Sequence, residues 1–79
     1  MADNIVEISS ITVNKDDFKD AIMGCVDDRL NAVYNFDKIV ENAIKYGVDI
    51  DEQTITAQSN DWCFTFHLVT LDLIMGVGL

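Results

Sequence analysis

The 79-residue sequence predicts a single small α+β domain, with two or three helices packed on one face of a small antiparallel sheet in the order β-α-α-β-β. Three observations lead to this class. Segment 5–13 is rich in β-branched residues, segments 15–28 and 36–46 repeat apolar residues at helical spacing, and segment 54–66 contains two short strand patterns around a turn signal. No proline, Gly/Ser linker or repeat interrupts the chain, so residues 1–79 are expected to form one domain.

The first predicted strand covers residues 5–13, and the first predicted helix covers residues 15–28. Asn14 is placed to cap that helix, with Asp16 and Asp17 in its first turn, where the helix dipole favours anions. At about 100° per residue, its apolar side chains fall on one stripe and its acidic side chains fall on the opposite side. We expect the helix to break or change direction near residues 28–31.

The second predicted helix covers residues 36–46, with Asn35 as its N-cap and Gly47 as its stop. Its apolar residues cover an arc of about 160°, which is typical of a helix packed against a core. The residues expected to be buried against the sheet are Ile39, Val40, Ala43 and Ile44.

The C-terminal third is predicted to be β structure. Residues 54–57 form one strand, residues 59–61 form a turn, and the returning strand runs from Trp62 to about residue 71. A helix is the alternative for residues 67–75, because Phe64, Leu68, Leu71 and Met75 also fit a helical face. Residues 76–78 are expected to be a loose tail.

The charge balance limits the partners. Five Lys and Arg residues against 14 Asp and Glu residues give a formal net charge of −9. Direct binding to nucleic acid or to an anionic membrane is therefore not expected, and a partner with a basic surface would be attracted. The alternative is that the acidity provides only solubility. The chain shows no signal-peptide pattern and no membrane-spanning run, so we expect a cytoplasmic protein.

The residues that could support catalysis are few. His67 is the single histidine, and Cys25 and Cys63 are the two cysteines, each among apolar neighbours. We expect His67 to be structural and both thiols to be reduced and buried. An EF-hand beginning at Asp49 would need Gly and Glu where Thr54 and Asn60 stand, so a solvated acidic loop is expected. No catalytic residue, metal site or cofactor is predicted.

The acidic side of the first helix is the candidate partner-binding surface. Five carboxylates there surround Met23, which would be exposed without a partner, and acids around an apolar anchor are typical of an interface. The predicted partner-binding residues are Asp16, Asp17, Asp20, Met23, Asp27 and Asp28. A plain solvated helix face is the alternative.

Two functions of different classes follow. In length, acidity and lack of motifs, the chain is similar to small phage-encoded inhibitors such as DNA-mimicking anti-CRISPR and anti-restriction proteins. That similarity of composition and size implies a non-enzymatic inhibitor that covers the basic nucleic-acid-binding surface of a partner protein. The alternative is a structural or assembly module, a homo-oligomer or complex subunit, that uses the apolar segment 62–71 as its interface.

Overall fold

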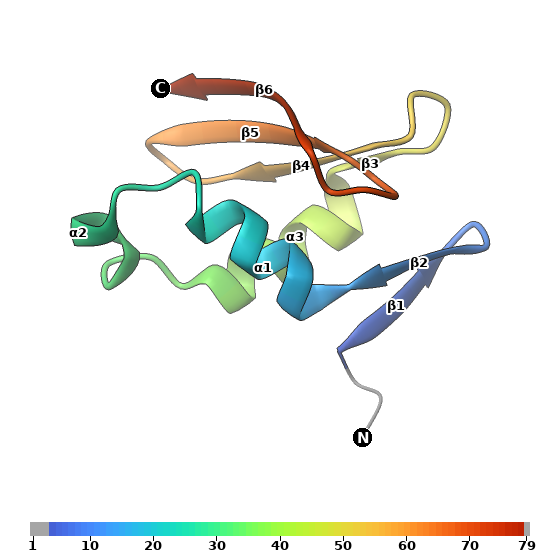
Figure 1. Ribbon diagram of the computed structural model, residues 1–79, viewed down its shortest axis with the longest axis horizontal. Helices are drawn as coiled ribbons and strands as arrows, with labels where there is room; N and C mark the ends of the chain where they lie inside the picture. Colours follow the sequence, from blue (N-terminus) through green and yellow to red (C-terminus); the bar gives the residue numbers. More distant parts are fainter. Residues whose placement is uncertain (1–3, 79) are drawn as a thin grey trace.

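The computed structural model describes residues 4–78, and they form the predicted α+β class (Figure 1). Strands β1 and β2 form an N-terminal hairpin, and strands β3 to β6 form a four-stranded antiparallel sheet in that order. The long helices α1 and α3 lie between the hairpin and the four-stranded sheet in this view. The elements are β1 Ile5–Ile8, β2 Ile11–Asn14, α1 Lys15–Met23, α2 Asp28–Asn31, α3 Phe36–Tyr46, β3 Val48–Asp49, β4 Thr54–Gln58, β5 Trp62–His67 and β6 Leu73–Gly78.

The predicted strand over residues 5–13 is in fact a hairpin, with Val6 opposite Val13 and Ile8 opposite Ile11. Its turn residues Ser9 and Ser10 have φ values of 49° and 70°. Positive φ at both central residues defines a type I′ turn, whose twist matches the twist of paired strands. Serine is not the residue usually found there, so the sequence did not reveal the turn.

Helix α1 begins as predicted, because the Asn14 side chain accepts hydrogen bonds from the backbone N–H groups of Asp16 and Asp17. The predicted extent of 15–28 is wrong: α1 ends at Met23, and Gly24 is its C-cap. Glycine costs about 1 kcal/mol in a helix relative to alanine. Asp27 then caps the short helix α2 by accepting a hydrogen bond from the Arg29 backbone N–H. The change of direction therefore comes earlier than residues 28–31.

Helix α3 has the predicted bounds and the predicted caps. The Asn35 side chain accepts a hydrogen bond from the Lys38 backbone N–H, and the Gly47 N–H donates to the Ala43 carbonyl. Ile39, Val40 and Ala43 are buried, as predicted. Ile44 is only half-buried.

The four-stranded sheet is built from consecutive strands. The turn at residues 59–61 and the two strands around it are confirmed as β4 and β5, with Ile55 opposite Phe66 and Ala57 opposite Phe64. Two predictions about the C-terminus are wrong: β5 ends at His67 rather than near residue 71, and residues 76–78 belong to strand β6 rather than to a tail. The helix considered for residues 67–75 is also absent from the described structure.

The core lies between the helices and one face of this sheet. Phe18 of α1 and Phe66 of β5 meet edge to face, with ring centroids 5.5 Å apart. The buried apolar residues are Val13, Phe18, Ile22, Val26, Phe36, Ile39, Val40, Ala43, Ile55, Ala57, Trp62, Phe66 and Leu68. Among residues 4–78, no helix has the length and apolar character needed to cross a bilayer; the longest, α3, has 11 residues.

Candidate protein-interaction surfaces

Helix α1 presents three of the predicted partner-binding carboxylates. Asp16, Asp17 and Asp20 are exposed, whereas Phe18 and Ile22 on the other side of the helix are fully buried. Asp16 accepts a 2.6 Å hydrogen bond from the Asn4 side chain. In residues 4–78, none of these three carboxylates forms an ion pair. The exposed side of α1 is therefore an acidic surface on a helix that the core holds in place.

The other predicted members of this surface lie elsewhere. Asp27 and Asp28 belong to the start of α2, so the single row of carboxylates expected on one helix does not exist. Asp27 pairs with Arg29 across 3.3 Å, and the hydrogen bonds from Arg29 lower the pKa of that carboxyl. Met23 is half-buried and packs against the core, so the expectation of an exposed apolar anchor is wrong.

Three of the five cationic side chains pair with acids outside the group Asp16, Asp17 and Asp20. Lys19 pairs with Asp37 at 3.0 Å, and Lys45 pairs with Glu41 at 3.9 Å. Together with Arg29, these cations are each engaged by an acid outside the group Asp16, Asp17 and Asp20. The acidic surface of α1 can therefore attract a basic partner.

Strand β6 is a second candidate surface that the sequence prediction missed. All six of its residues are exposed, and Met75 is 60% exposed. The interface predicted at residues 62–71 is wrong in its position, because Trp62, Phe66 and Leu68 are buried and β5 lies between β4 and β6. The signal in the sequence was the run Leu73–Val77, which contains four large apolar residues and no charge. Because residues 76–78 were interpreted as a loose tail, this run was not recognised as a strand.

On strands β4 to β6, the sheet face directed away from the helices carries no carboxylate; Asp49 of β3, opposite Thr54, is the acid on this side of the sheet. Residues paired across strands point to the same face of a sheet. Thr56 pairs with Thr65, which in turn pairs with Met75, and the two threonine hydroxyls are 3.1 Å apart. Cys63 and Val77 form another pair on this face, so Cys63 points away from the core side occupied by Trp62 and Phe64. Carboxylates are absent from the strand residues β4 to β6 that form this face.

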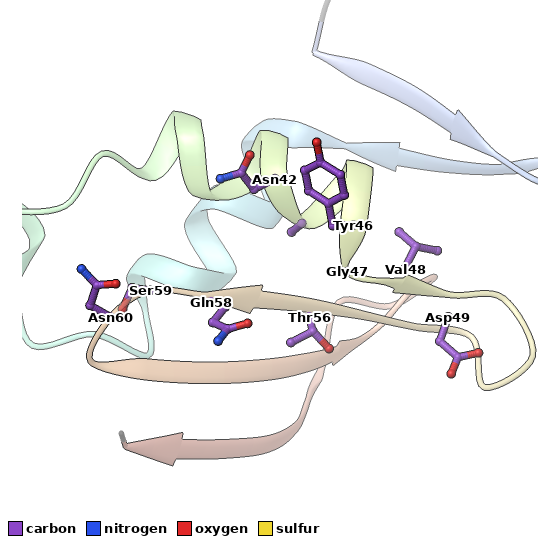
Figure 2. A pocket seen from close by; sticks show the side chains of 10 residues that line it. Asn42, Tyr46, Gly47, Val48, Asp49, Thr56, Gln58, Ser59 and Asn60 are labelled. Carbon is purple, nitrogen blue, oxygen red and sulfur yellow. The ribbon is translucent and has the colours of Figure 1, made fainter.

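A shallow groove of about 610 Å³ lies between α3 and β4. Figure 2 shows Asn42 and Tyr46 of α3 on one side of it, Thr56 and Gln58 of β4 on the other, and Asp49 at one end. Tyr46 is 81% exposed. Asp49 is the one carboxylate of the lining, and its side chain accepts a hydrogen bond from the Glu52 backbone N–H. The lining offers hydrogen-bonding groups and one aromatic ring, without a nucleophile paired to a base.

The surroundings of the histidine and the two cysteines are those of residues that support the fold. His67 is half-buried, and its Nδ1 accepts hydrogen bonds from the backbone N–H groups of Val69 and Thr70, which shapes the turn after β5. Cys25 and Cys63 are free thiols and only half-buried, rather than fully buried as expected. Burial raises the pKa of the Cys25 thiol, which disfavours the reactive thiolate. Within residues 4–78, no group of three or more His, Cys, Asp or Glu side chains is arranged to hold a metal ion.

Comparisons of the chain with protein-family models, with curated proteins and with solved structures found no match. The function proposed below is therefore based on the surfaces of this chain alone. The two surfaces differ in chemistry: α1 offers carboxylates on a fixed helix, and β6 offers an uncharged strand at the edge of a sheet.

Proposed function

We propose that this protein is a non-enzymatic binding protein that inhibits or regulates a partner by covering the partner's basic nucleic-acid-binding surface. The observation that carries the proposal is the exposed side of α1, where Asp16, Asp17 and Asp20 lie opposite the buried Phe18 and Ile22. Since the two cysteines are free, we propose that it acts in the cytoplasm, where thiols stay reduced.

The geometry suits the recognition of Lys and Arg clusters. Asp16 and Asp20 are one helical turn apart, about 6 Å along the axis, and Asp17 extends the same surface around the helix. Lys and Arg side chains that hold phosphates can bind carboxylates instead, through charge-assisted hydrogen bonds. The Asn14 cap and the burial of Phe18 fix α1 before binding, so little conformational entropy is lost on association.

The experiment compares two variants of equal net charge. The first replaces Asp16, Asp17 and Asp20 with Asn. The control carries Asp51→Asn, Glu52→Gln and Asp72→Asn, which remove the same charge from exposed positions outside α1. Immobilised parent and variants are used to capture proteins from a bacterial lysate at low and high salt, and each captured protein is tested for displacement of a labelled DNA duplex.

We expect the parent and the control to capture a DNA-binding protein at low salt, to release it at high salt, and to displace the duplex. The α1 variant should fail in both steps while still folding, since Asp16, Asp17 and Asp20 are exposed. Its melting temperature should fall, because the charges of Asp16 and Asp17 in the first helical turn each contribute about 0.3–1 kcal/mol. Equal capture by the α1 variant, or capture without displacement of the duplex, would show that α1 does not cover a nucleic-acid-binding surface.

A further inference from the structure

Strand β6 forms an open edge of the four-stranded sheet. It pairs with β5 on one side only and lies at the margin of the molecule, and none of the elements formed by residues 4–78 lies beyond it (Figure 1). Its six residues contain no charged side chain, and Leu73, Ile74, Met75 and Val77 are all large exposed apolar residues. Natural edge strands usually carry charges or prolines that prevent pairing with another chain. This strand has neither within Leu73–Gly78.

The direction of the main-chain groups on β6 follows from the pairing pattern. The Thr56 N–H donates to the Gly47 carbonyl, away from β5. The main-chain N–H and C=O groups of the neighbouring residues Ile55 and Ala57 therefore point towards β5. Their partners on β5 point back towards β4, and the alternating residues Cys63 and Thr65 point towards β6. The donation from the His67 N–H to the Asp72 carbonyl agrees with this order.

Met75 and Val77, opposite Thr65 and Cys63, therefore direct their main-chain groups to β5. Gly76 and Gly78 direct theirs outward, where a further strand would lie. On the sheet face that Gly76 shares with Phe64, a Cβ atom added at Gly76 would lie 2.9 Å from the Phe64 ring. The outward N–H and C=O groups are thus flanked by apolar side chains and by glycine.

We propose that two copies of this chain pair through β6 in antiparallel orientation about a two-fold axis at Gly76, which joins their sheets into one. In this register the two Gly76 residues face each other with their outward main-chain groups. Met75 of one copy lies beside Val77 of the other on the sheet face directed away from the helices. The interface is isologous, so one strand supplies both halves.

The self-complementary strand, with Met75 and Val77 on either side of Gly76, indicates a second copy as the occupant, and the position of the charges permits it and favours the antiparallel orientation. Each copy has a net charge of −9, and β6 is a part of the surface where two copies can meet without opposing carboxylates. Asp72 directly precedes the strand. In the antiparallel register, the two Asp72 residues lie about 27 Å apart at about 3.4 Å per residue, well beyond a Debye length of about 8 Å. Parallel pairing would place them side by side.

The test has two readouts on the full chain. Sedimentation velocity over a range of concentrations should show a monomer–dimer equilibrium that strengthens with salt, because salt screens the repulsion between two acidic copies. Amide hydrogen exchange followed by NMR should show Gly76 and Gly78 gaining protection as the concentration rises. Met75 and Val77, already turned to β5, should be protected at every concentration.

Two pairs of variants separate pairing from folding. No atom lies within 4 Å of a Cβ added at Gly78, so Gly78→Ala fits, whereas Gly78→Pro removes an outward donor. Gly78→Pro should raise the dimer dissociation constant about tenfold or more, since symmetry removes two donors per dimer, and Gly78→Ala should leave it unchanged. Met75→Lys should abolish the dimer, and Val69→Lys, at another exposed position, should not.

A monomer at all concentrations in high salt, or dimers that survive both Gly78→Pro and Met75→Lys, would overturn the proposal. So would exchange protection that appears outside β6. The proposed binding function of α1 is tested separately, because it predicts weaker binding at high salt and is unaffected by Met75→Lys.

Discussion

Gly47, which ends helix α3, lies directly against Thr56 in the middle of strand β4. The Thr56 N–H donates a 2.8 Å hydrogen bond to the Gly47 carbonyl, and a Cβ atom on Gly47 would lie 2.3 Å from the Thr56 carbonyl oxygen. The φ of Gly47 is −102°, so a positive φ is not the reason for glycine here. The close approach of α3 to the sheet is the reason.

Gly47→Ala should therefore destabilise the domain, because a backbone oxygen cannot move aside as a flexible side chain can. Overpacking of this kind costs about 1–3 kcal/mol. Gly24→Ala is the matched control: its Cβ would have ordinary contacts of 3.4 and 3.6 Å, in a right-handed backbone conformation. Urea unfolding should show a lower midpoint for Gly47→Ala and an equal or higher midpoint for Gly24→Ala. Equal midpoints for both variants would contradict the contact.

The inner face of α3 provides a second stability test. Val40 is 3% exposed, so Val40→Asp would bury a carboxylate without a partner, at a cost of several kcal/mol. That is a large share of the total stability of a small domain. Val33→Asp, at a residue 73% exposed, should change stability by about 0.5 kcal/mol or less. Circular-dichroism melts of the two variants measure this difference. A parent-like melting temperature for Val40→Asp would show that the face of α3 that carries Val40 is not buried.

The Ser9–Ser10 turn can be improved. Both residues have positive φ, which costs side-chain-bearing residues about 1–2 kcal/mol each, less where a short polar side chain bonds locally. Ser9→Asn combined with Ser10→Gly supplies the residues that type I′ turns prefer and should stabilise the protein by about 1 kcal/mol. Ser10→Val, which introduces a β-branched residue at a φ of 70°, should lower the melting temperature. The reverse order of melting temperatures would exclude this turn type.

Tyr34 gives a pH prediction. Its hydroxyl donates a hydrogen bond to the Asp61 carboxylate, and this bond, with desolvation, raises the pKa of Tyr34 above its ordinary value of 10.0. Since the pKa is higher in the folded state, the stabilisation is fully present below pH 10 and is lost as the pH rises through the raised pKa. In a Tyr46→Phe background, tyrosinate absorbance should titrate above pH 10, and Asp61→Asn should shift that titration towards 10.0. An unchanged titration would mean that Asp61 does not hold this proton.

The sequence predicted best where local signals and tertiary packing agree. Helix α3 has an Asn cap, a full apolar stripe and a terminal glycine, and its bounds match the prediction. Strands β4 and β5 were recognised because residues 59–61 form a turn of the usual composition. The β1–β2 turn escaped notice because serine at positive φ depends on the pairing of the two strands around it.

The candidate surface was predicted less well, because helix length decides which side chains share a face. The apolar stripe continued through Cys25 and Val26, yet Gly24 ends α1, and these residues reach the core from a turn. This single boundary moves Asp27 and Asp28 to the start of α2, off the helix that carries Asp16, Asp17 and Asp20. Strand β6 was missed for a related reason: Gly76 serves packing against Phe64, a contact that sequence spacing does not show.

The order of the four-stranded sheet also bears on how quickly the chain folds. Strands β3 to β6 pair strictly with their neighbours in the sequence, so each pairing closes only a short loop. Short loops lose little entropy on closure, and chains dominated by local contacts fold fast. The sequence contains no proline, which removes the slow isomerisation step of many refolding reactions. Refolding at low protein concentration should therefore complete in a single fast phase.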